Sequence, residues 1–176
     1  GFKINKKEIK KLDEYTKKEI KKLENKIHKL TGIKFNISST KQLSEVLFNR
    51  LQITGRIRKT PKGKLSTRAT ELEKLAEAHP VIPLILEYRE LVKLKTTYIE
   101  RFPKLIDPKD NRLHTTFIQT GTVTGRLASQ NPNLQNIPIK TELGQEFRKV
   151  FIAEKGCKLI SLDYSQLELR IAAHIA

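Results

Sequence analysis

Two long segments of this chain carry apolar residues at intervals of three and four, and this feature constrains the fold more than any other. The first segment covers residues 6–30 and is followed by Gly32, a residue type that often terminates helices. The second covers residues 70–102, where Pro80 and Pro83 predict a break or kink. Each segment has a single apolar stripe. The two therefore most simply form an antiparallel pair of helices that bury their stripes against each other.

The segment between the two predicted helices has the features of a basic tip. Ser39–Gln42 has the pattern of a capping box and opens a short helix that runs through Leu51. The Gly, Pro and charged residues of 54–64 then predict a loop, after which Ser66 and Thr67 resume helical structure. A basic loop and exposed helix N-termini can bind phosphate groups, although a solvated surface loop can have the same composition.

After Pro103 the sequence changes character, which predicts a boundary between a helical arm and a second unit. The predicted elements of that unit are a strand over 112–119, a short helix over 142–151, an apolar strand over 158–163 that ends on Asp163, and a helix over 166–175. The expected fold class is α+β and mainly helical. Residues 1–104 would form a long antiparallel helix pair with a basic tip, and residues 105–176 a partial α/β unit.

The charge of the chain favours an anionic partner. Thirty-five Lys and Arg residues against nineteen Asp and Glu residues give a formal net charge of +16, and no acid lies between Glu45 and Glu71. A nucleic acid and an anionic membrane surface both fit such a charge. No apolar run approaches the roughly 20 residues that a membrane span needs. The single cysteine, Cys157, excludes an internal disulfide and a multi-cysteine zinc site.

Two stretches in the second unit carry the most specific information. Asp163 follows an apolar run and precedes a helix, a common position for a carboxylate that binds Mg²⁺, although a helix N-cap would also explain it. Residues 163–170 read Asp-Tyr-Ser-Gln-Leu-Glu-Leu-Arg, and residues 120–138 include Thr-Gly-Arg-Leu-Ala-Ser and Asn-Pro-Asn-Leu-Gln-Asn-Ile-Pro. Both stretches resemble signatures of family A DNA polymerases of the bacterial polymerase I type. Residues 88–98 resemble the end of that family's thumb.

The resemblance implies a division of the chain and a role for several residues. Residues 1–104 would be the thumb, and residues 105–176 the first part of the palm. Asp163 would bind both of two catalytic Mg²⁺ ions, with Tyr164 beside it at the metal site. Ser165 and Gln166 would line the nucleotide, and Glu168 would exclude the 2′-hydroxyl of a ribonucleotide. The implied contacts to the primer-template duplex are Arg126, Asn133, Gln135, Asn136, Lys140, Arg89, Lys93, Asn36, Ser39, Lys41, Lys64 and Ser66.

Two positions, Lys140 and Asn5, depart from the residues that are usual in this family. Lys140 stands where this family commonly has Arg, so a phosphate contact there would lose the bidentate fork. Asn5 stands where an Asp is usual. His114 lies near the entry to the predicted palm, and we interpret it as a structural residue.

We therefore expect a piece of a DNA-directed DNA polymerase that binds primer-template DNA in the bacterial cytoplasm, at the nucleoid. The complete protein would bind dNTPs, and no obligate protein partner is evident. Two-metal transfer needs a further carboxylate, which this family carries in a later His-Asp-Glu motif that does not occur here, so the chain alone is predicted to be inactive. The alternatives are a non-catalytic DNA-binding accessory module and, from the first 100 residues alone, a helical-hairpin interaction protein.

Overall fold

The computed structural model describes residues 1–60, 63, 65–139 and 141–176. Its helical elements are, in chain order, α1 (Lys6–Thr31), α2 (Thr40–Ser44), η1 (Glu45–Arg50), α3 (Ala69–Leu72), η2 (Glu73–Leu75), α4 (Val81–Leu94), η3 (Lys95–Ile99), η4 (Phe102–Leu105), α5 (Glu142–Arg148) and α6 (Leu167–Ile175). Its strands are β1 (Phe2–Ile4), β2 (Ile106–Asp107), β3 (Arg112–Leu113), β4 (Thr116–Ile118), β5 (Ala128–Gln130) and β6 (Phe151–Ile152). The fold is mainly helical with small antiparallel sheets, which confirms the predicted α+β class at that level. None of the helices among these residues has both the length and the apolar character that a membrane span requires.

The first predicted helix is present as α1, and local hydrogen bonds fix both of its ends. Asn5 is the N-cap, and its Oδ1 accepts the backbone N–H groups of Lys7 and Glu8 at 3.1 and 3.3 Å. At the other end Gly32 adopts a left-handed conformation with φ of 70°, and its N–H donates to the carbonyl of His28. The predicted stop at Gly32 is therefore confirmed.

The second predicted helix, over residues 70–102, is broken into several pieces. α3 and η2 end in a turn at residues 76–78, and Pro80 is the N-cap of α4. Pro83 lies in the first turn of α4, where a backbone N–H would have no partner within the helix, so the missing donor costs little there. The predicted break is confirmed at Pro80, while Pro83 is accommodated without one.

The tip of the arm is partly as predicted. Ser39 caps α2, and its Oγ accepts the N–H of Gln42 at 3.4 Å. The side chain of Gln42 accepts the N–H of Asn36 at 2.7 Å instead of bonding back to Ser39, so only half of the expected capping box forms. The prediction that Ser66 and Thr67 resume helical structure is wrong. Both residues are buried and precede α3.

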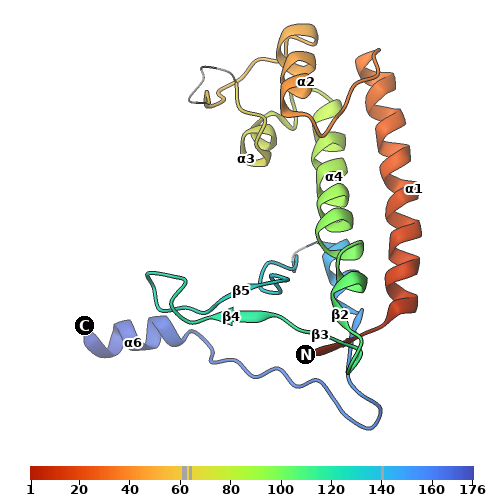
Figure 1. Ribbon diagram of the computed structural model, residues 1–176. Coiled ribbons are helices and arrows are strands. Elements are labelled where there is room, and N and C mark those ends of the chain that lie inside the picture. Colours follow the sequence, from red (N-terminus) through yellow and green to blue (C-terminus); the bar gives the residue numbers. More distant parts are fainter. Residues whose placement is uncertain (61–62, 64, 140) are drawn as a thin grey trace.

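α1 and α4 lie side by side and antiparallel, with α2 and α3 at one end of the pair (Figure 1). The first hydrophobic core lies at that end and fixes the tip to the pair. Its fully buried members include Ile27, Ile37, Leu43, Leu47, Leu72, Val81, Ile82 and Ile85. Several of these residues belong to the stripes predicted from the sequence, so the two stripes do face each other as expected.

The larger sheet has the strand order β2–β3–β1–β6, and all of its neighbouring strands are antiparallel. The predicted single strand over 112–119 is two strands that belong to different sheets. β3 pairs with β1, placing Leu113 opposite Phe2, whereas β4 pairs with β5, placing Phe117 opposite Ser129. The chain changes partner at the two residues between β3 and β4, because each half finds its own antiparallel neighbour.

A second hydrophobic core joins the base of the helix pair to the larger sheet. It consists of Ile4, Ile9, Leu94, Tyr98, Ile99, Phe102, Leu113, Ile137, Phe147 and Val150. The ring of Phe147 is at its centre. Its centroid lies 5.6 Å from those of Tyr98 and Phe102 and 6.0 Å from that of Phe151. α5, capped by the hydroxyl of Thr141, thereby packs against η3 and η4.

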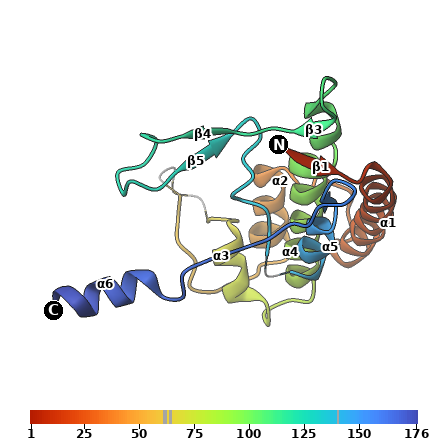
Figure 2. The same cartoon turned by 90° about the horizontal axis from the view of Figure 1, so that it is seen from below.

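The predicted apolar strand over 158–163 is not formed. Its apolar residues Leu159, Ile160 and Leu162 are exposed, as is Cys157. A strand needs a neighbour for its backbone hydrogen bonds, and no residue in the described ranges pairs with this segment. The helix that follows is present as α6, but none of its residues is buried, and it stands apart from the helix pair (Figures 1 and 2).

Candidate nucleic-acid interface

Two adjoining grooves run along α4 and η3. The first has a volume of about 1010 Å³ and lies between α2, the tip residues around Ser66, and α4. The second, of about 680 Å³, lies between η3 and the loop over residues 129–136. Lys93 and Thr97 line both grooves, so the two form one continuous surface.

The linings of these grooves are basic. Their charged members are Lys41, Arg68, Arg89, Lys93 and Arg101, and no acid belongs to either lining as far as the chain is described. A separate groove between α1, α4 and α5 is the opposite. It is lined by Glu19, Glu87, Glu90, Glu142 and Glu146. Positive and negative side chains of α4 therefore line different grooves, which gives the first two a positive potential suited to a phosphate backbone.

The grooves collect part of the predicted primer-template contacts. Lys41, Ser66, Arg89 and Lys93 line the first groove, and Asn133 and Asn136 join Lys93 in the second. Asn36, Ser39, Arg126 and Gln135 line neither. Lys64 and Lys140 lie outside the described residues.

Several of these predicted contacts already make hydrogen bonds within the chain. The Oδ1 of Asn36 accepts the N–H of Ser38 at 3.0 Å, and the Oγ of Ser66 accepts the N–H of Arg68 at 3.3 Å. Arg89 donates to the carbonyl of Thr67. Lys41 and Lys93, by contrast, are exposed. The lysines are therefore the predicted contacts with the most freedom to reach a ligand.

The loop that lines the second groove is organised by a buried hydroxyl. The Oγ of Ser129 donates to the Oδ1 of Asn133 at 2.9 Å and accepts the N–H of Leu134 at 3.2 Å. Nearby, the hydroxyl of Tyr98 donates to the carbonyl of Asn136. Neither Ser129 nor Tyr98 was predicted to have a role at the site. The only sequence signal for the role of Ser129 is its position four residues before Asn133, in a stretch rich in turn-forming residues.

Arg126 and Glu168 are brought together although 42 residues separate them. Arg126 extends from the loop between β4 and β5, and its Nη2 lies 2.5 Å from the Oε1 of Glu168 on α6. Both side chains are largely exposed. Just before α6, Gln166 adopts a left-handed backbone with φ of 54°, and the carbonyl of Ser165 accepts Nε of Arg170 at 2.9 Å. The fold thus unites an arginine predicted to contact the primer-template duplex with the glutamate predicted to exclude a 2′-hydroxyl.

Asp163 and Tyr164 are exposed on the extended segment before α6. Asp163 belongs to no group of three metal-binding side chains within residues 1–60, 63, 65–139 and 141–176. A carboxylate suits Mg²⁺, and an exposed one is free to bind, but a single carboxylate is only part of a two-metal centre. The residues present therefore fit one side of such a centre.

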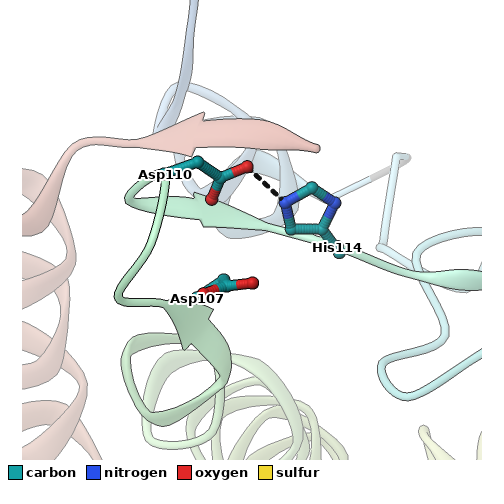
Figure 3. A group of neighbouring side chains, drawn as sticks. All are labelled: Asp107, Asp110 and His114. Carbon is teal, nitrogen blue, oxygen red and sulfur yellow. Dashed lines mark hydrogen bonds and ion pairs between the residues drawn. The ribbon is translucent and has the colours of Figure 1, made fainter.

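One group of metal-binding side chains does occur, at the β2–β3 hairpin. Ligand atoms of Asp107, Asp110 and His114 lie within 4.8 Å of one another (Figure 3). The Nε2 of His114 is 2.7 Å from a carboxylate oxygen of Asp110, and the other oxygen of Asp110 accepts the N–H of Arg112 at 2.9 Å. Burial raises the pKa of Asp110, but these bonds outweigh it and lower the pKa overall. The bonds stabilise the hairpin, which agrees with a structural role for His114.

Comparison with known proteins gives a consistent result. The sequence profile of DNA polymerase family A matches residues 6–176. The chain is 54% identical over 154 residues to DNA polymerase I of Deinococcus radiodurans and 56% identical over 155 residues to the thermostable DNA polymerase I of Thermus aquaticus. Each alignment covers 88% of this chain but only 16% and 18% of those proteins. The chain thus spans less than a fifth of their length.

A solved structure is also similar. It is the POL domain of Pol1 from M. smegmatis in complex with a DNA primer-template and dNTP. The TM-score is 0.87 at 35% sequence identity, and the match covers 99% of this chain and 30% of that one.

Proposed function

Since this chain belongs to DNA polymerase family A, we propose that it binds primer-template DNA and supplies part of the catalytic centre of a DNA-directed DNA polymerase of the polymerase I type. The observation that carries the proposal is the continuous basic surface of the two grooves. In this proposal residues 1–104 are the thumb, residues 105–176 begin the palm, and the whole protein acts in the cytoplasm at the bacterial nucleoid.

Binding through this surface depends mainly on phosphate contacts. Lys41 and Lys93 are exposed cations on the groove lining, and Arg68 and Arg101 are two more. Such contacts do not read the base sequence, whereas Arg126, Gln135 and Asn136 are the side chains proposed to reach the minor groove. Ser39 supports the binding surface as the N-cap of α2, and Asn36 and Ser66 support it through hydrogen bonds to the backbone N–H groups of Ser38 and Arg68.

Asp163 is the proposed catalytic carboxylate, with Tyr164 beside it. Bound there, Mg²⁺ would neutralise the charge of the dNTP triphosphate during transfer. Ser165 and Gln166 line the nucleotide. Glu168 occupies the space that a 2′-hydroxyl would need, and in the structure described here its carboxylate is paired with Arg126.

The 176-residue chain does not extend a primer by itself in this proposal. A two-metal centre needs at least one more carboxylate, and no described acid joins Asp163 in a metal-binding group. The second candidate is a DNA-binding accessory module without catalysis, with which the isolated position of Asp163 also agrees.

Fluorescence anisotropy with a labelled primer-template tests DNA binding by the chain. The four exposed groove cations, without the half-buried Arg89, predict a slope of about −3 to −4 for log K against log salt. Lys41→Ala combined with Lys93→Ala should reduce the slope by about 2, while Lys18→Ala together with Lys29→Ala, two exposed cations on α1 outside the grooves, serves as the charge-matched control. Affinity that stays constant between about 50 and 200 mM salt would rule out the phosphate-contact proposal.

Primer extension by a longer polymerase that contains this segment separates the two candidates. Asp163→Asn should abolish extension while DNA affinity changes little, because the amide cannot replace a carboxylate ligand. Glu168→Ala in the same protein should extend with ribonucleotides more readily than the parent does. An Asp163→Asn variant that retains extension would leave the accessory module as the better account.

A further inference from the structure

We propose that Arg89 is a positioning residue that holds the tip segment against the first groove, and that it does not itself contact DNA phosphate. The tip segment is defined here as Arg58, Lys59 and residues 65–67. This inference rests on the proposed function and deepens it. It assigns the phosphate contacts to the tip segment and to the groove lysines Lys41 and Lys93, and it assigns to Arg89 the positioning of the tip segment.

Arg89 reaches from α4 to the end of the tip segment. Its Nη1 donates to the carbonyl of Thr67, and its Nη2 lies 3.5 Å from the hydroxyl of the same residue. Thr67 is itself buried, with 7% of its surface exposed. Burial also lowers the pKa of the Arg89 guanidinium, which is the effect expected of a cation withdrawn from water. The guanidinium thus directs both of its Nη groups at Thr67, one at the backbone carbonyl and one at the side-chain hydroxyl.

The other end of the tip segment is held by a buried carboxylate. The Oε2 of Glu71 accepts the N–H of Arg58 at 3.0 Å, and Glu71 has only 6% of its surface exposed. The two halves of the segment are joined to each other, because the N–H of Ser66 donates to the carbonyl of Arg58 at 3.0 Å and Lys59 pairs with Leu65. Glu71 and Arg89 therefore clamp the segment from two helices.

The clamp leaves the cations of the tip free. The side chains of Arg58 and Lys59 are exposed, while the backbone that carries them is bonded to Glu71 and to Ser66. Loss of Arg89 would free the Thr67 end, and the exposed cations would lose their fixed position beside the groove. Arg89 would then affect DNA binding through the tip segment.

Arginine and lysine separate the two roles of this position. A lysine keeps the positive charge and could still contact a phosphate, but its single ammonium cannot form the planar two-donor fork that reaches Thr67. A positioning role therefore predicts that Arg89→Lys behaves like Arg89→Ala. A phosphate contact predicts that Arg89→Lys resembles the unchanged chain.

The first measurement is amide hydrogen exchange of the free 176-residue chain at Arg58 and Ser66. Arg89→Lys and Arg89→Ala should each exchange at least about tenfold faster there, which corresponds to the loss of one charged hydrogen bond. Lys93→Ala, one turn further along α4 and lining the same groove, is the matched control and should leave both amides unchanged. Unchanged exchange in Arg89→Lys would overturn the proposal, and this readout does not depend on DNA binding.

The second measurement is a double-mutant cycle for primer-template affinity with Lys59→Ala. If Arg89 acts through the tip, the Lys59→Ala substitution should cost little in an Arg89→Lys background, although it costs several-fold in the unchanged chain. Full additivity of the two losses would overturn the proposal. If the chain binds no DNA, the proposed function is refuted. The exchange data come from free protein, so they still show whether Arg89 holds the tip segment. Circular dichroism identifies any variant that fails to fold, and Arg89→Lys then replaces Arg89→Ala.

Discussion

Removal of the Phe147 ring should destabilise the chain strongly, because this side chain fills the centre of the second core. Phe147 is fully buried and contacts the rings of Tyr98, Phe102 and Phe151. Truncation of a buried Phe to Ala costs about 3–5 kcal/mol, from lost transfer energy and from the cavity that remains. For a chain of this size, each kcal/mol lowers Tm by about 2–4 °C, so the expected decrease is about 10 °C.

Two further variants make the experiment decisive. Phe147→Leu keeps an apolar side chain but loses three aromatic pairs, so it should cost about 2 kcal/mol. Phe117→Ala removes the same ring from an exposed position, where 56% of the residue surface is accessible, and should cost less than about 0.5 kcal/mol. Urea titrations followed by circular dichroism at 222 nm measure all three variants. A Phe147→Ala chain no less stable than Phe117→Ala would refute the assignment of this core.

Three smaller perturbations test other parts of the fold. Asn5→Ala removes the N-cap of α1 and should lower the free energy of unfolding by about 1 kcal/mol in a urea titration, and an unchanged value would mean that the cap is idle. Gly144→Ala would place a Cβ 2.7 Å from the Cβ of Pro138 and should destabilise by about 1–3 kcal/mol, whereas a stabilised variant would contradict this crowding. Hydrogen bonds from Lys74 and from a backbone N–H lower the pKa of Glu71, so its carboxylate stabilises the fold above the unfolded value of 4.5, and that contribution is lost as the pH falls through the lower folded pKa. The stability deficit of Glu71→Gln should therefore shrink between about pH 6 and pH 3, and a deficit that is the same at both pH values would argue against this role.

The sequence predicted those elements that depend on neighbouring residues. The apolar spacing of residues 6–30, the stop at Gly32, the cap at Ser39 and the break at Pro80 all follow from contacts within a turn or two of helix, which is the range that a local pattern reports. The antiparallel pairing of α1 and α4 followed in turn, because each helix has one stripe to bury.

The failures in the predicted strands share one physical cause, which is that strands depend on distant partners. Residues 158–163 have the apolar run of a buried strand, yet no described segment accepts their backbone hydrogen bonds. Residues 112–119 alternate like one strand but divide between two neighbours. Neither outcome can be read from the segment itself, because β-pairing is decided by chain segments far away in sequence.

The candidate site shows the same division. The resemblance placed Lys41 and Lys93 among the predicted primer-template contacts, and both line the first groove. The engagement of Arg89 by Thr67 and the pairing of Arg126 with Glu168 join residues that lie 22 and 42 positions apart. Only the fold brings such side chains together. The sequence therefore could not distinguish a charged residue that contacts a ligand from one that bonds to another part of the chain.

The shared core at the base of the arm has a mechanical consequence. Its aromatic rings come from η3, η4, α5 and β6, so a hinge at residues 102–106 would have to separate rings that lie 5.6–6.1 Å apart. Each buried aromatic residue exposed by that separation would cost about 1.5–3 kcal/mol. The base of the helix pair is therefore fixed rigidly to the larger sheet by the second core. Under the proposed function, movement toward a bound duplex would therefore arise from bending of α1 and α4 along their length and from displacement of the tip.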